Sequence, residues 1–148
     1  MDKKLSLFFL FVLLLITDPS YAKITVSNAW ARVTPSGSGA VFMTIENNNE
    51  KDDTLLSASS ENAEMSMIHK TVRENNIAKM QHVMGGIKIP NNEKVNLKPG
   101  GYHIMLMGLN NKPALNDRIH LNLSFENHED ITINPIVKLR PPMMHGHE

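Results

Sequence analysis

The chain has 148 residues and a formal net charge of zero at pH 7, with 15 basic and 15 acidic side chains. This balance provides no basic face for nucleic acid and no polybasic run for anionic lipid. The sequence contains no cysteine, which excludes disulfides, thiolate catalysis and every metal site that needs a Cys ligand. Ten methionines and seven histidines stand out in a chain with one Trp, two Tyr and five Phe.

Residues 1–22, MDKKLSLFFLFVLLLITDPSYA, have the layout of a secretory signal peptide. A basic start at Lys3 and Lys4 precedes an apolar run over residues 5–16, and the segment ends on the small residue Ala22. The apolar run is too short to span a membrane. We therefore expect export, removal of this segment, and a mature protein without a membrane span.

The mature sequence is a series of short strand-like segments separated by turn residues. No segment shows a sustained helical period with caps at both ends. The segments, in chain order, are ITVSNAWARV, AVFMTIEN, TLLSAS, MSMIHKTV, IAKMQHV, IKIP, KVNLK, YHIMLM, RIHLNLSF and DITINPIVKL. Eight to ten strands at this spacing are typical of an antiparallel Greek-key β-sandwich or barrel. We expect one all-β domain over residues 23–139.

The last residues, 140–148, read RPPMMHGHE and follow a different pattern. They contain two adjacent prolines and no periodic apolar residues, which is typical of a flexible tail. Their soft side chains are Met143, Met144, His145 and His147. A role for this tail in metal binding stays open from the sequence.

Histidine and methionine alternate with apolar residues in three of the predicted strands. Successive side chains of a strand point to opposite faces, so donors two residues apart share one face. The three sets are Met65, Met67 and His69; Met80, His82 and Met84; and His103, Met105 and Met107. Each set could present soft donors on a single face of a sheet.

The first two sets flank the segment RENN and read as a hairpin. A turn at Glu74 and Asn75 would place His69 opposite Met80. A turn at Asn75 and Asn76 would place His69 opposite His82, still with all donors on one face. A slip by one residue would turn one set away. Opposed residues have Cβ atoms about 4.5–5.5 Å apart, within reach of one ion.

The third segment contributes His103 and Met105, which lie two residues apart on one face, about 6.6 Å along the strand. With the hairpin they give four donors: the imidazoles of His69 and His103 and the thioethers of Met80 and Met105. Neutral thioether sulfur is a soft ligand that suits Cu(I), whereas zinc prefers thiolate, carboxylate or more imidazole and calcium prefers oxygen. A blue-copper centre needs a cysteine thiolate, which the chain lacks. The donor set therefore suits carrying Cu(I) rather than redox cycling.

Most of the other methionines and histidines have an ordinary explanation. Methionine packs irregular gaps in cores, and we expect that role for Met43, Met65, Met84 and Met107. His120 and His128 are expected to be surface residues or satisfied groups in the core. His82 could contact the ligands or lie exposed near the site, and Met67 could add a fifth soft donor or merely pack. Trp30, the single tryptophan, is expected to be a core or near-core anchor. Tyr102 is expected to pack behind the site and to hold His103 in place.

The sequence resembles the periplasmic copper chaperones of the PCu(A)C type over nearly all of its mature length. The resemblance rests on NAWARVTPSGSGAVFMTIEN, DDTLLSASSENAEMSMIH, KMQHVMGGIKIP, LKPGGYHIMLMGL and RIHLNLSFEN. The family's copper motif is His, ten residues, Met, about twenty-one residues and His-x-Met. Here ten residues separate His69 from Met80, and twenty-two separate Met80 from the His103-Ile104-Met105 triplet. Met67 replaces the acidic residue usual two positions before the first His.

The resemblance implies a cupredoxin-like or immunoglobulin-like β-sandwich that binds Cu(I) near one edge. It also implies delivery of copper to the copper-site subunit of cytochrome c oxidase, in some members together with a thioredoxin-like copper chaperone. From these features we expect a non-enzymatic, monomeric periplasmic Cu(I) carrier.

Two other functions are alternatives to a copper carrier. An exported β-sandwich that binds a protein through its edge strands, with methionine as core, is the alternative function. It predicts that His69 and Met80 lie apart from His103. A catalytic metalloprotein would need an acid or base near the donors, and no carboxylate lies within the three donor segments.

Overall fold

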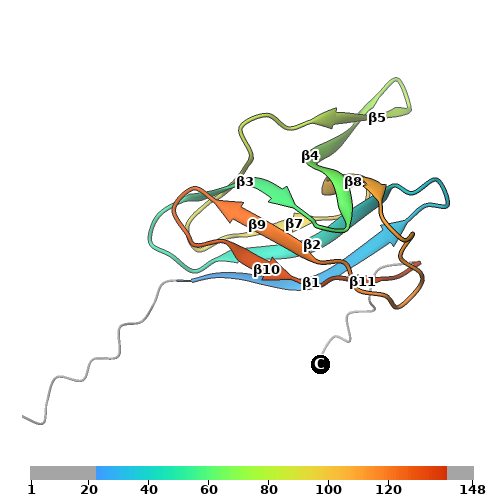
Figure 1. The fold of residues 1–148 in the computed structure, drawn as a ribbon. Coiled ribbons are helices and arrows are strands. Elements are labelled where there is room, and N and C mark those ends of the chain that lie inside the picture. The colour runs from blue at the N-terminus through green and yellow to red at the C-terminus, as the bar shows by residue number, and fades with distance from the viewer. Residues whose placement is uncertain (1–22, 140–148) are drawn as a thin grey trace, which may run out of the picture.

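The computed structural model describes residues 23–139, and within them all regular secondary structure is β-strand (Figure 1). The signal peptide expected at residues 1–22 and the tail expected at residues 140–148 lie outside the described residues. No helix long and apolar enough to cross a membrane occurs among residues 23–139. The described part of the chain thus has the all-β fold that the sequence predicts.

Eleven strands make up this domain, slightly more than the eight to ten expected. They are β1 Ile24–Val33, β2 Gly39–Asn47, β3 Asp53–Ser59, β4 Ala63–Glu74, β5 Ile77–His82, β6 Ile87–Ile89, β7 Lys94–Leu97, β8 Tyr102–Leu109, β9 Leu121–Phe125, β10 Ile131–Ile133 and β11 Ile136–Val137.

The extra strand comes from DITINPIVKL, which forms β10 and β11 rather than one strand. Pro135 lies between these two strands, and proline cannot donate a hydrogen bond to a strand ladder.

Two sheets face each other as a sandwich. The larger sheet has the order β11-β1-β2-β8-β4-β5, with β7 also paired to β2, and the smaller has the order β10-β9-β3-β6. All pairs are antiparallel except β1 with β11, which run parallel. That pair departs from the purely antiparallel sandwich expected. Strand β8 lies between β2 and β4, so the donor-bearing strands β4, β5 and β8 are neighbours in one sheet.

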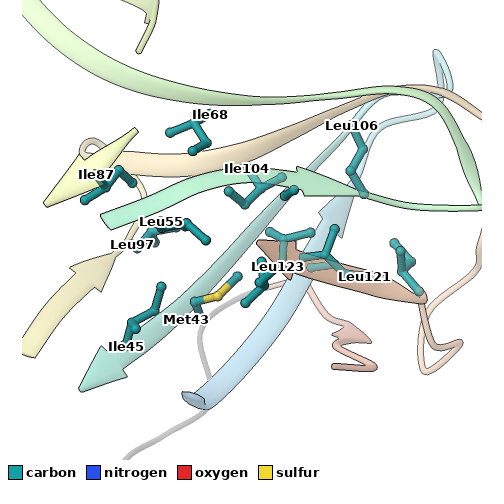
Figure 2. Packing of buried hydrophobic residues seen from close by; sticks show 14 of the residues in the cluster. Met43, Ile45, Leu55, Ile68, Ile87, Leu97, Ile104, Leu106, Leu121 and Leu123 are labelled. Atoms are coloured by element: carbon teal, nitrogen blue, oxygen red, sulfur yellow. The ribbon is translucent and has the colours of Figure 1, made fainter. Parts of the chain in front are cut away.

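The core lies between the two sheets and is filled by aliphatic side chains (Figure 2). Ile45, Ile104 and Leu106 of the larger sheet meet Leu55 and Leu123 of the smaller, and all five are fully buried. Each such side chain contributes about 1.5–3 kcal/mol through removal from water. Met43 belongs to this core, as expected. The core fixes which face of β8 points inward and therefore which residues face out.

The β4–β5 hairpin extends beyond the body of the sandwich (Figure 1). Every residue of β5 is exposed, so this strand is held by backbone pairing with β4 rather than by burial. Its turn consists of Asn75 and Asn76, with φ angles of 49° and 62°. Two central residues with positive φ define the type I′ turn, whose twist matches a hairpin. Asparagine tolerates this conformation better than most residues.

Candidate metal site

The outer face of the larger sheet carries the predicted donors. On β8, Ile104 and Leu106 point into the core, so His103 and Met105 point outward. In the ladder between β4 and β8, His69 pairs with His103 and Met67 pairs with Met105. The strand alternation inferred from the sequence therefore gathers the two histidines and their neighbouring methionines on one face.

The hairpin register is set by the Asn75–Asn76 turn. His69 lies opposite His82, and Met80 lies opposite Thr71. The alternative turn at Glu74 and Asn75, with its direct pairing of His69 and Met80, is therefore wrong. The reason is conformational: the turn needs positive φ at both central residues, which asparagine adopts more readily than glutamate.

Met80 borders a cavity together with His103 and Met105 and does not pair directly with His69. A cavity of about 220 Å³ is lined by Met80, His103 and Met105, together with Phe42 and Thr71. Met80 is 62% exposed, so its thioether is free to turn toward an ion. Three of the four predicted donors thus border one space.

A larger hollow, of about 610 Å³, lies at the other end of β2, among residues 48–53 and Asn127 and His128. Its lining is polar and charged and includes none of the predicted donors. Size alone would favour this hollow, but the soft-donor chemistry favours the smaller cavity beside His103.

His103 has the geometry of a preorganised ligand. Its side chain is only 3% exposed, and its Nδ1 lies 3.2 Å from the carbonyl oxygen of Gly101. A carbonyl can only accept, so Nδ1 carries the hydrogen and donates it, which leaves a lone pair on Nε2. That Nε2 is buried and has no hydrogen-bond partner within residues 23–139. A buried nitrogen of this kind needs a partner, and a metal ion would supply one.

His69 provides the second imidazole. Its ring centroid lies 5.9 Å from that of His103 and 5.8 Å from that of His82. Its Nδ1 is buried and likewise unpartnered in the described part of the chain. Burial lowers the pKa of His69 below 6.5, and charge on His103 and on His82 would lower it further. A lowered pKa keeps the ring neutral, which is the form that binds metal.

Aromatic side chains of β1 and β2 wall the site on the side away from the hairpin. The rings of Trp30 and Phe42 lie 4.7 Å apart, and Phe42 lies 6.2 Å from His103. The Arg32 guanidinium lies over both, 5.6 Å from Trp30 and 5.9 Å from Phe42. Trp30 is buried, and it lies on this outer face rather than in the core cluster between the sheets. Together these groups shield one side of His103 from water.

Phe42 and Arg32 are residues that the sequence interpretation missed. In the β1–β2 ladder Trp30 pairs with Phe42 and Arg32 pairs with Ala40, which puts both on the face of Met105. The alternation of AWARV could have indicated Arg32, since it shares its strand face with Trp30. The pairing with β8 could not have been foreseen from either segment alone.

Tyr102 does not hold His103 in place as expected. It packs against the core cluster on the inner side, and the Lys70 ammonium lies 5.1 Å from its ring centroid. The contact that orients the His103 ring comes instead from the Gly101 carbonyl.

Three methionines expected to pack do not. Met65, Met84 and Met107 are 52%, 88% and 41% exposed. Met107 in particular does not pack beneath Met105, because it lies at an end of β8 where the β2 ladder has stopped at Leu106. Met67 is half-buried opposite Met105.

The donor set defines what the site can bind. No three His, Asp or Glu side chains among residues 23–139 converge to hold a metal ion, whereas the thioethers of Met80 and Met105 line the cavity beside His103. None of the described residues lining the cavity carries a carboxylate. Two imidazole nitrogens and thioether sulfurs form a neutral, soft environment that favours a monovalent soft cation over zinc or calcium.

Fold and site together define a cupredoxin-like β-sandwich with a His/Met cluster on the outer face of its larger sheet. The chain belongs to the LpqE-like family, described as "Putative lipoprotein LpqE-like", whose model matches residues 24–137.

Two curated proteins have similar sequences. "Putative lipoprotein Lxx21020" of Leifsonia xyli subsp. xyli is 34% identical over 102 residues, which cover 69% of this chain and 61% of that protein. "Uncharacterized protein RP573" of Rickettsia prowazekii is 27% identical over 121 residues, 78% of this chain and 67% of that one. The chain therefore spans about three fifths to two thirds of the length of these relatives. The lipoprotein names of the family and of the Leifsonia xyli protein agree with the expectation of an exported protein.

Solved structures share the fold. The copper-bound PCuAC domain from PmoF2 superposes with a TM-score of 0.66 at 22% identity, covering 78% of this chain and 92% of that domain. The solution structure of CuI-DR1885 from Deinococcus radiodurans gives a TM-score of 0.61 at 25% identity, over 80% and 81% of the two chains. These matches confirm the PCu(A)C resemblance at the level of the fold.

Proposed function

We propose that this protein is a non-enzymatic periplasmic carrier that holds Cu(I) through His69, Met80, His103 and Met105. One observation carries the proposal. Two neighbouring imidazoles, 5.9 Å apart by ring centroid, each keep a buried nitrogen without a partner in the described residues, beside a cavity lined by two thioethers. Unpaired buried nitrogens cost about 1–3 kcal/mol each, which a bound soft cation would offset.

Cu(I) fits this donor set better than Cu(II). Thioether sulfur is soft, and four neutral ligands leave the ion's charge uncompensated, which favours the lower charge. The copper-bound states named for the PmoF2 domain and for DR1885 support copper as the cargo.

The alternative, a protein-interaction module with methionine as core, is less well supported. It expects His69 and Met80 to lie apart from His103, whereas the His69 ring neighbours His103 and Met80 borders the same cavity. It also expects methionine to be buried, and Met80 is largely exposed.

A competition titration with a Cu(I)-binding chromophore tests the site. The His103→Ala, Met105→Ala double variant should lose Cu(I) affinity by about tenfold to a hundredfold or more, since even neighbours of metal ligands cost that much. The matched control is His120→Ala with Met84→Leu, which changes an exposed histidine and an exposed methionine away from the cavity. Equal copper retention by wild type and the double variant would rule out the site.

Delivery is a separate part of the proposal. We infer that the recipient is the copper-site subunit of cytochrome c oxidase, with a thioredoxin-like copper chaperone as a further partner, and that the carrier acts as a monomer. Mixing the Cu(I)-loaded protein with the metal-free subunit should move copper to the subunit after separation. Retention of all copper by the carrier, in the presence and absence of the second chaperone, would contradict this recipient while leaving the binding site intact.

A further inference from the structure

Four methionines continue the histidine pair along β4 and β8. Next to His69 and His103, Met67 lies opposite Met105, and beyond that pair Met65 lies opposite Met107. Opposed Cβ atoms lie about 4.5–5.5 Å apart, and residues two apart on one strand lie about 6.6 Å apart. The four thioethers therefore occupy the corners of a small rectangle on the outer face of the sheet.

Packing does not account for the outer part of this rectangle. Met65 is 52% exposed and Met107 is 41% exposed, because neighbouring strands end before reaching them. β5 pairs with β4 only from His69 onward, and β2 pairs with β8 only as far as Leu106. Two large apolar side chains therefore lie opposite each other while partly exposed to water.

We propose that Met65, Met67 and Met107 form a second binding site for a soft monovalent cation, Cu(I) or Ag(I). Three thioethers from two adjacent strands can converge on one ion, since methionine has a long and flexible side chain. Thioether sulfur selects soft cations of this class. Met65 and Met107 are exposed and Met67 is half-buried, so the outer two side chains are accessible from solvent, in contrast to the buried nitrogens of the histidine pair.

The second site adjoins the first through the pair of Met67 and Met105. An ion captured at the exposed methionines can pass to Met105 by exchanging one thioether for another, without returning to water. The exposed site thus serves as the entry and exit point of the histidine-containing site. This transfer role rests on the proposed function, whereas the second site itself does not.

Silver titration followed by NMR of methionine methyl groups labelled with ¹³C tests the inference, because each methionine reports separately. In the chain from Lys23 to Glu148, the first equivalent of Ag(I) should shift the methyl signals of Met80 and Met105. Further Ag(I) should shift those of Met65, Met67 and Met107. The Met43 methyl is buried and serves as the unshifted internal reference.

Two variants sharpen this test. The double variant Met65→Leu, Met107→Leu should abolish the second step, so the Met67 methyl signal should no longer shift when Ag(I) exceeds one equivalent. The Met80 and Met105 signals should still shift with the first equivalent. Met84→Leu removes a still more exposed methionine outside the rectangle and should leave both steps unchanged. Met65, Met84 and Met107 are all exposed, so both variants should fold as the wild type does.

The outcomes separate this inference from the proposed function. If Met80 and Met105 shift while Met65, Met67 and Met107 stay still at excess Ag(I), the second site is overturned and the first survives. If the three outer methionines shift and Met80 and Met105 do not, the second site stands and the four-donor site fails. A second step that survives in the Met65→Leu, Met107→Leu variant also overturns the inference.

Discussion

The two faces of β8 differ in what their side chains require. Ile104 and Leu106 point inward, are fully buried, and are satisfied by the aliphatic side chains around them. His103 and Met105 point outward, and the buried Nε2 of His103 has no hydrogen-bond partner among residues 23–139. One strand thus stabilises the sandwich with alternate residues and presents ligands with the others. This separation lets stability and metal binding be changed independently.

Replacing Ile104 by Ala should have the largest effect on stability. Removing a fully buried Ile side chain leaves a cavity, and we expect the free energy of unfolding to fall by about 2–5 kcal/mol. Met105→Leu on the opposite face conserves volume and should cost less than about 1.5 kcal/mol. Urea unfolding of the metal-free proteins measures both changes.

The same two variants should rank in the reverse order by their loss of Cu(I) affinity. Met105→Leu removes a thioether and should weaken Cu(I) binding by about tenfold or more, whereas folded Ile104→Ala should bind nearly as wild type does. A Met105→Leu variant with unaltered Cu(I) affinity would show that the outward face does not provide the ligand assigned to it.

The outward face should also make the metal-free protein sensitive to acid. The pKa of His69 lies below 6.5 in the folded state because of burial, then of the charges on His103 and His82. Between that lowered pKa and about 6.5 the unfolded chain binds more protons, so stability is complete above about 6.5 and declines as pH falls below it. Urea unfolding from about pH 7.5 to 5 measures this decline.

Comparison with variants assigns the decline to the site. His69→Gln should flatten this pH dependence. His120→Gln changes an exposed histidine directly before β9 of the smaller sheet and should leave the pH dependence unchanged. A decline that persists unchanged in His69→Gln would contradict the assignment to His69.

The turn of the β4–β5 hairpin should give the smallest effect. Asn76 has a φ of 62°, and Asn-Gly is a preferred sequence for this turn type. Asn76→Gly should therefore change the free energy of unfolding by less than about 1 kcal/mol, because relief at positive φ is offset by a more flexible unfolded chain. Cu(I) affinity, measured by the same chromophore competition, should be unchanged since the register is kept. A marked loss of Cu(I) would mean that Asn76 does more than form the turn.

Much of the fold and the sharing of one face by the donors could be predicted from alternation. His103, Ile104 and Met105 alternate between outside, core and outside as the period of a strand requires, and Pro/Gly/Asn breaks marked the strand ends. The same rule predicted that His69 and Met67 lie on one face. These features are local, so the sequence specifies them directly.

The rest depends on pairing between distant segments. Both Glu74–Asn75 and Asn75–Asn76 were plausible turns by loop length, and only the conformational preference for positive φ separates them. Exposure of Met65 and Met107 follows from where β5 and β2 stop pairing, which no single segment reveals. The same holds for Phe42 beside His103, since β2 and β8 are far apart in sequence.

X-ray absorption at the copper edge tests the central claim most directly. The chain ending at Leu139, loaded with one equivalent of Cu(I), excludes the histidines and methionines of residues 140–148. Two sulfur and two nitrogen neighbours are expected from Met80, Met105, His69 and His103, with the sulfur signal reduced in Met105→Leu. A shell made only of nitrogen neighbours would contradict the four-donor site.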